Sequence, residues 1–184
     1  MGLKSPKSIR HNGKKLSEIL EAHAKFAAGN GAGLRADLAG ADLRSADLRG
    51  CDLRGANFEG AKLDEADLRE CKLTRANFAG ASLLRAVANN SDFTEADFTA
   101  ADLSKANLGG CEIFCANLQK AVAQATIFRG SNLRRSNVAG ADLRNADFEN
   151  ALLAETNLRD ANTSGANLST SVIRELIEHN ARTQ

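Results

Sequence analysis

A period of five residues runs through most of this 184-residue chain. Divided into fives from Ala36, the sequence reads ADLAG, ADLRS, ADLRG, CDLRG and ANFEG, and 28 such pentads follow one another without insertion. The third position is Leu, Phe, Ile or Val except at Ala88, Ala123 and Thr163. A period of five fits neither the repeat of about 3.6 residues in an α-helix nor the repeat of about two in a β-strand. It fits a chain that turns a corner every five residues and stacks into a solenoid.

The five positions have separate structural roles. The first is always small and is Ala in 19 pentads, and the second is Asp or Asn in 19. We expect positions one and three to face inward, and the short polar side chains of position two to bind backbone N–H groups at each corner. No carboxylate differs from its many equivalents, so these acids are predicted to be structural and not catalytic.

The tandem A(D/N)LXX motif resembles the pentapeptide-repeat proteins over residues 36–175. The resemblance implies a right-handed quadrilateral β-helix with four pentads per coil, and therefore about seven coils. The fold class expected is an all-β solenoid with short α-helices at the N- and C-terminal ends. The family has no common enzymatic activity, and some members protect or inhibit DNA gyrase by resembling duplex DNA.

Folding the sequence at a period of twenty tests this architecture. One inward column contains Leu38, Phe58, Phe78 and Phe98, so large residues follow one another along the stack. The undersized Ala88 shares its coil with Phe78 and Phe93, as expected for a close-packed interior.

The two ends of the repeats need caps. We expect residues 1–15 to be a basic disordered tail, and residues 16–35 to form a capping helix with Ser17 as N-cap, followed by a Gly-rich linker. At the other end, residues 172–184 are expected to form a second capping helix and tail. Ile173, Leu176 and Ile177 are its candidate contacts with the last coil or with a second subunit of a homodimer.

Candidate groups for chemistry are few. The three histidines lie outside the coils and are expected to be solvated, and no Cys, His or acidic cluster has metal-ligand spacing. Three cysteines occupy inward slots and are expected to be free thiols, whereas Cys115 occupies an outward slot as an exposed thiol. We therefore predict a protein that is not an enzyme, with no catalytic, cofactor or metal site.

The charge pattern separates the candidate functions. Residues 36–175 contain 16 Lys or Arg and 20 Asp or Glu, with the two signs interspersed, which disfavours DNA mimicry and a gyrase partner. Residues 1–35 contain seven basic and two acidic residues. The basic tail has no aromatic residue for stacking, so direct nucleic-acid binding is not expected. The chain has no apolar run long enough for a membrane span or a signal peptide, and a cytoplasmic location is predicted.

Apolar residues interrupt the outward pattern in the middle of the repeats. Position two is apolar at Val87, Val122, Ile127 and Leu152, and position four carries Leu84 and Phe114. Folding at a period of twenty places Leu84, Val87, Val122 and Ile127 on two adjoining faces of the third and fifth coils. These four residues form either an exposed patch for a partner or side chains that fill space beside Ala88 and Ala123. The sequence predicts a non-catalytic protein-interaction scaffold with an unknown protein partner, and a gyrase modulator as the alternative.

Overall fold

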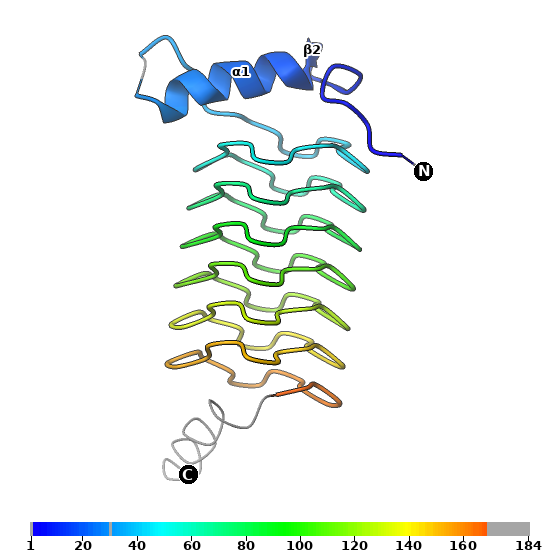
Figure 1. The fold of residues 1–184 in the computed structure, drawn as a ribbon, viewed down its shortest axis with the longest axis vertical. Helices are drawn as coiled ribbons and strands as arrows, with labels where there is room; N and C mark the ends of the chain where they lie inside the picture. The colour runs from blue at the N-terminus through cyan, green and yellow to red at the C-terminus, as the bar shows by residue number, and fades with distance from the viewer. Residues whose placement is uncertain (1, 30, 169–184) are drawn as a thin grey trace.

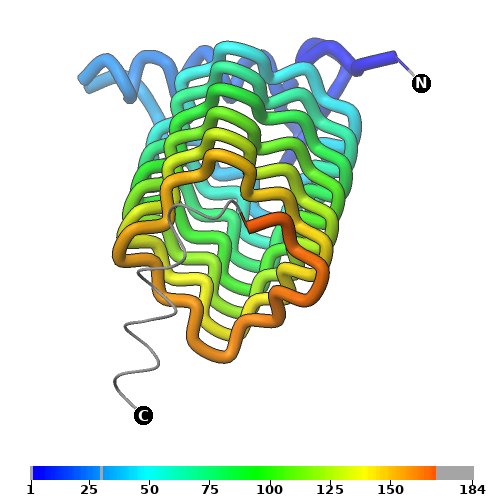
Figure 2. Tube along the Cα trace, turned by 60° about the horizontal axis from the view of Figure 1, so that its bottom comes forward, coloured from blue at the N-terminus to red at the C-terminus, as the bar shows by residue number. Residues whose placement is uncertain are grey.

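The computed structural model describes residues 2–29 and 31–168. The predicted C-terminal helix, with Ile173, Leu176 and Ile177, lies outside these residues. The repeats form a stack of coils, and a helix with a small hairpin covers its N-terminal end (Figure 1). Viewed obliquely from the other end, successive coils superimpose with a four-sided outline (Figure 2).

Parallel backbone bridges join each coil to the next. Every bridge in the repeats links a position-two residue to the residue twenty later, from Asp37–Asn57 to Asp147–Asn167. Because one residue per pentad pairs in this way, the coils form four narrow parallel ladders, one on each face of the stack.

A tight turn separates each pentad from the next. The N–H of position one donates to the carbonyl of position three in the pentad before, as Ala41 does to Leu38 at 3.0 Å. Every position-five residue from Gly40 to Gly165 has φ between +53° and +71°, as the third residue of a type II turn requires. The predicted polar cap of the corner is confirmed, since each Asp and Asn at position two from Asp37 to Asn162 accepts the N–H of position four.

The interior follows the predicted alternation. Position one from Ala36 to Thr156 and position three from Leu38 to Leu153 are buried, apart from the half-buried Cys51. Phe78 stacks between two phenylalanines of the neighbouring coils, with ring centroids 4.7 Å from Phe58 and 5.0 Å from Phe98.

Buried hydroxyl and thiol groups at position one have hydrogen-bond partners. Each donates to a position-three carbonyl of the previous coil, as Ser91 Oγ does to Leu68 at 2.6 Å and Cys71 Sγ does to Leu48 at 3.0 Å. Small polar residues are therefore tolerated in this interior.

The N-terminal segment differs from the expected disordered tail. Residues 2–15 are ordered and include strands β1, Arg10–His11, and β2, Lys14–Lys15. Lys4 donates its N–H to Ser45 and accepts the N–H of Asp47 at 2.9 Å. The expectation was wrong because Asp47 has no preceding coil to pair with: the residue twenty earlier lies in the capping helix. Lys4 supplies the backbone partner that a preceding coil would otherwise provide.

Helix α1, Leu16–Ala27, lies across the open end of the first coil (Figure 1). Its start is not capped by Ser17 as predicted; the Glu18 carboxylate instead accepts the N–H of Lys15 at 3.1 Å. Gly33 passes so close to α1 that a Cβ there would lie 1.9 Å from the backbone nitrogen of Phe26. Glycine at this position lets the chain return beneath the helix to the first coil.

His23 also corrects a prediction, because it is 0% exposed and not solvated. Its Nδ1 accepts the N–H of Ala36, the first residue of the first coil, at 2.9 Å. Sequence position alone could not show this contact, which forms only because α1 folds back over the coil.

Candidate functional site

The four residues of the candidate partner patch lie on the outer wall of the coils. Val122 is 37% exposed, and Leu84, Val87 and Ile127 are half-buried. Val87 and Ile127 lie on one face, where both pair with Asn107 between them. Val122 lies on the adjoining face, in the column of Ser82 and Asp102, and Leu84 belongs to the pentad of Ser82. The four residues are therefore divided between two faces.

The face of Val87 and Ile127 has a more distinctive property, which is a local absence of charge. In the first two coils, positions two and four of this face form the ion pairs Asp47–Arg49 and Asp67–Arg69. Further along the stack, the next ion pair on this face is Arg129–Asp147. Between them lies a stretch that we term the uncharged window: Val87, Asn89, Asn107, Gly109 and Ile127. The cores of protein interfaces are depleted in charged residues, and this window has that composition.

The polar groups of the uncharged window are held in place by one another. Asn89 Nδ2 donates to Asn107 Oδ1 at 2.8 Å, and the N–H of Gly109 donates to the same oxygen at 3.1 Å. A Cβ at position 109 would lie 3.1 Å from Asn89 Nδ2, so glycine leaves this amide pair unobstructed. Gly109 stands out in the sequence as a glycine between the apolar positions of the neighbouring coils, but Asn89 and Asn107 were not predicted. Counting charges along each twentieth residue would have found them.

The apolar residues of position two replace a stabilising interaction. Val87, Val122 and Ile127 have no side-chain acceptor for the position-four N–H that Asp and Asn bind elsewhere. A hydrogen bond of this kind contributes about 0.5–1.5 kcal/mol. These three corners, and a fourth at Leu152, therefore carry apolar surface in place of the residue type that suits the fold.

Two other apolar residues on the outer wall lie on a different face. Leu152 is 44% exposed and pairs with Asn132. The half-buried Phe114 lies beneath the Arg135 guanidinium, 5.9 Å from the ring centroid. Phe114 is thus partly covered within the protein.

Arginines neutralise many of the carboxylates of the coils. Hydrogen bonds from Arg144 lower the pKa of Asp142 to about 2. Asp67 is buried, which raises the pKa of its carboxyl, but hydrogen bonds from Arg69 and the charge of Arg49 outweigh burial and lower it below the usual range. The acids of these pairs therefore remain ionised, but their charge is locally compensated.

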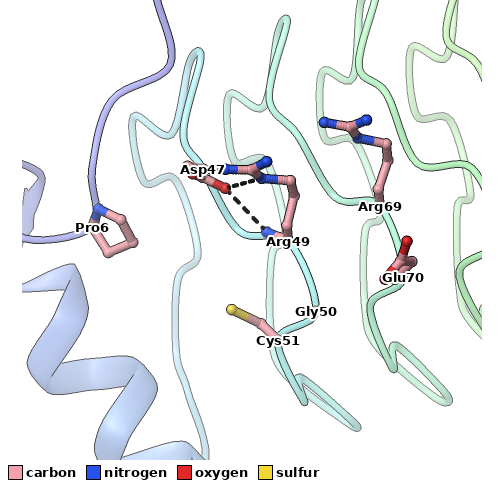
Figure 3. Close-up of a pocket in the computed structure, with 7 residues that line it drawn as sticks. All are labelled: Pro6, Asp47, Arg49, Gly50, Cys51, Arg69 and Glu70. Atoms are coloured by element: carbon pink, nitrogen blue, oxygen red, sulfur yellow. Dashed lines mark hydrogen bonds and ion pairs between the residues drawn. The ribbon is translucent and has the colours of Figure 1, made fainter.

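A hollow lies between the N-terminal segment and the first coils (Figure 3). It has a volume of about 580 Å³ and is lined by Pro6, Asp47, Arg49, Gly50, Cys51, Arg69 and Glu70. Both guanidinium groups are already bound to Asp47 and Asp67, and burial raises the pKa of the Cys51 thiol. The hollow therefore presents neither a free cation nor an activated nucleophile.

Two of the remaining thiols are buried and one is exposed. Cys71 and Cys111 are buried, and burial raises the pKa of each to about 12. Cys115 is exposed, and all four cysteines are free. Within residues 2–29 and 31–168, no three His, Cys, Asp or Glu side chains are grouped to hold a metal ion, and no helix has the length and apolar character to span a membrane.

Single-residue parallel bridges every twenty residues, with a left-handed residue at each corner, define an all-β solenoid. The family model for pentapeptide repeats matches residues 35–70, 71–110 and 111–150. The chain belongs to the pentapeptide-repeat family, as its motif predicted.

Solved structures of the family are similar to this chain. HetL, a pentapeptide repeat protein involved in heterocyst differentiation regulation in the cyanobacterium Nostoc sp. strain PCC 7120, is 30% identical; the match covers 73% of this chain and 70% of HetL, with a TM-score of 0.53. Trypsin-treated QnrB1, a plasmid-mediated fluoroquinolone resistance protein, is 25% identical over 80% of this chain and 84% of its own, with a TM-score of 0.38. A pentapeptide repeat protein from the thylakoid lumen of Arabidopsis thaliana is 35% identical over 54% of this chain and 69% of its own, with a TM-score of 0.28. The search of curated proteins found no match.

Proposed function

We propose that this protein is a non-catalytic scaffold that binds a partner protein through the uncharged window. The observation that carries the proposal is the switch along one face from paired charges to Val87, Asn107 and Ile127 and back to paired charges. Apolar side chains around a fixed amide pair offer a partner both a hydrophobic contact and hydrogen bonds, and a charged border would surround them. HetL, a family member that takes part in regulation, is a precedent for a pentapeptide-repeat protein acting in a regulatory process.

The alternative of DNA mimicry directed at gyrase is weaker. Duplex DNA presents one negative charge about every 1.7 Å along its axis. Many acids of the coils are instead paired with arginine, as in Asp42–Arg44, Asp52–Arg54 and Asp142–Arg144. Such pairs do not produce a continuous negative stripe.

Several finer features belong to the same proposal. We propose a right-handed sense and about seven coils for the solenoid, and a cytoplasmic location.

Ile173, Leu176 and Ile177 are proposed to form a homodimer contact. Light scattering of the intact chain and of a Leu176→Glu, Ile177→Glu variant tests the dimer, and a monomeric intact chain would refute it.

Affinity capture tests the scaffold proposal. The intact chain and a Val87→Asp, Ile127→Asp variant are used as baits in a lysate of the source organism, and captured proteins are identified by mass spectrometry. Leu152→Asp is the control, since it places one such charge at an exposed apolar position two on another face. We expect a partner that is retained by the control and lost by the double variant.

Two outcomes would contradict the scaffold proposal. A partner that binds the intact chain and the double variant equally does not use the uncharged window. Recovery of gyrase subunits would favour the alternative, and a supercoiling assay would then decide it.

A further inference from the structure

The N-terminal cap, residues 2–35, displays cations that the fold does not neutralise. Within the described part of the chain, six exposed basic residues of the cap make no ion pair: Lys4, Lys7, Arg10, Lys14, Lys15 and Arg35. In the coils, by contrast, ten of the eleven described arginines are ion-paired, with Arg134 the exception. The four lysines of the coils make no ion pair in the described structure either, so the cap differs from the coils in its unpaired arginines, Arg10 and Arg35.

The hairpin holds some of these cations close together. Arg10 lies directly opposite Lys15, and His11 opposite Lys14. Like charges at directly opposed positions destabilise a strand pair. The segment is nevertheless fixed, because Ile9 and Leu16 are buried and the N–H of Leu16 donates to Ile9 at 2.8 Å. The basic groups are therefore presented on an ordered scaffold.

A hollow of about 350 Å³ lies beside the hairpin and α1, and we term it the cap hollow. Its apolar lining residues are Ile19, Ala22 and Leu34, and its basic ones are His11, Lys14 and Arg35. Leu34 is 63% exposed, the highest value among the exposed large hydrophobic residues of the described chain.

The two carboxylates in the lining already have partners. Glu18 accepts the N–H of Lys15, and Asp37 accepts Asn57 Nδ2 at 2.9 Å. Neither carboxylate pairs with Lys14 or Arg35 in the described structure, so these two cations remain available to an external anion.

We propose that the cap hollow binds an acidic peptide segment that inserts one large aliphatic side chain. The aliphatic group would cover Leu34 and contact Ile19, while neighbouring carboxylates would pair with Lys14 and Arg35. Additional acids of the segment would follow the hairpin toward Arg10 and Lys15.

The lining favours a peptide over other anionic partners. Bases of single-stranded nucleic acid bind by stacking on aromatic side chains, whereas no Phe, Tyr or Trp lines this hollow. Peripheral membrane binding uses a broad apolar helix face, whereas here one strongly exposed leucine lies in a concave site. The cap hollow is separate from the uncharged window, so each proposal can fail without the other.

Peptide selection provides the test. A displayed library of short random peptides is selected on the intact chain, and the enriched peptides are synthesised and titrated by fluorescence anisotropy. We expect enrichment of acidic sequences with one conserved aliphatic residue. Leu34→Ser and the Lys14→Glu, Arg35→Glu double variant should each weaken binding roughly tenfold or more.

Matched variants control for net charge and for apolar surface. Lys105→Glu, Lys120→Glu makes the same charge change on the coils, and Leu152→Ser removes an exposed leucine elsewhere; both should leave peptide affinity unchanged. Thermal melting establishes that every variant is folded. Failure to enrich acidic peptides, or peptides insensitive to the cap variants, would overturn the proposal.

Two further probes distinguish other polyanions. A labelled oligothymidylate and vesicles of phosphatidylserine with phosphatidylcholine are titrated with the same variants. If either binds more tightly than the selected peptides, and Leu34→Ser has no effect while the charge reversal abolishes binding, the cap is a general polyanion surface and the peptide proposal is wrong.

Discussion

At the residue scale, the interior depends on volume matched between neighbouring coils. Phe78 is fully buried between Phe58 and Phe98, and Phe93 meets its edge with centroids 5.9 Å apart. Phe78→Ala is expected to lower the free energy of unfolding by about 3–5 kcal/mol, because the stacked rings above and below cannot collapse into the space. A urea titration measures the change. Arg44→Ala should leave the midpoint nearly unchanged, and equal shifts for the two variants would refute the inward assignment.

His23 is the residue that sequence reasoning placed least well. With Nδ1 accepting from Ala36, the proton of the neutral ring is on Nε2, which is buried and has no hydrogen-bond partner in the part of the chain described. Burial lowers the pKa of His23; the charges of Arg35 and Arg54 lower it further, while Asp52 opposes the shift. The ring is therefore held neutral, and α1 is tied to the first coil through it.

This geometry gives a pH prediction with a definite sign. Above the ordinary histidine pKa of about 6.5, both folded and unfolded chains carry the neutral ring and stability is unaffected. As pH falls below that value the unfolded chain takes up the proton first, so stability falls until the folded pKa is passed. The His23→Gln variant retains an acceptor for the N–H of Ala36 but has no histidine to protonate at this position. Its free energy of unfolding should therefore fall less than that of the intact chain when the pH is lowered. Urea titrations at about pH 7.5 and pH 5 compare the two, and equal losses would exclude His23 as the cause.

At the element scale, the corner is the unit that the sequence predicts best. The spacing of Asp and Asn predicts a turn every five residues and the side-chain acceptor at each turn. The prediction succeeds because the same five-residue conformation recurs along the stack. The left-handed φ of position five was not predicted, since Gly occurs there beside residues such as Glu65 and Arg75, which rarely adopt that conformation. Repetition, and not residue preference, imposes the turn on these residues.

The corners of the apolar positions give a prediction that separates stability from binding. Val87→Asn, Val122→Asn should retain or raise the free energy of unfolding, because each new amide can accept the N–H of the residue two later, worth about 0.5–1.5 kcal/mol. Thermal melting of the double variant measures this effect. A loss of several degrees would mean that the two valines fill space beside Ala88 and Ala123, and any loss of partner binding would then reflect damage to the fold.

At the scale of the whole molecule, the stack and a helix at the start of residues 16–35 could be predicted, whereas the ordered segment before that helix and its contacts could not. Periodicity determines which residues lie one coil apart, so columns such as Phe58, Phe78 and Phe98 follow from counting. The cap has no repeat, and its structure depends on single long-range contacts: Lys4 with Ser45 and Asp47, and His23 with Ala36. The basic composition of residues 1–15 led to the prediction of a disordered tail. Composition carries no information about the backbone hydrogen bonds that hold this segment against the first coil.

Removal of residues 1–15 tests what the cap does for the stack. In a solenoid each coil contacts only its neighbours, so the loss should be local. The N–H of Asp47 would lose its partner Lys4, and the edge of the first coil would become available to another chain. Hydrogen exchange should quicken in the first coil, residues 36–55, and remain slow around Phe98, while light scattering should show association that grows with concentration.

A Lys7→Ala, Lys14→Ala variant is the control, because it lowers the charge of the cap and keeps the backbone bonds of Lys4. It should match the intact chain in both measurements. Faster exchange spread evenly over the whole stack would mean that the cap sets global stability, whereas unchanged exchange after deletion would mean that the first coil is stable without it. The expected local effect follows from the structure, since Lys4 occupies the place of a missing strand on one face only and α1 still covers the open end.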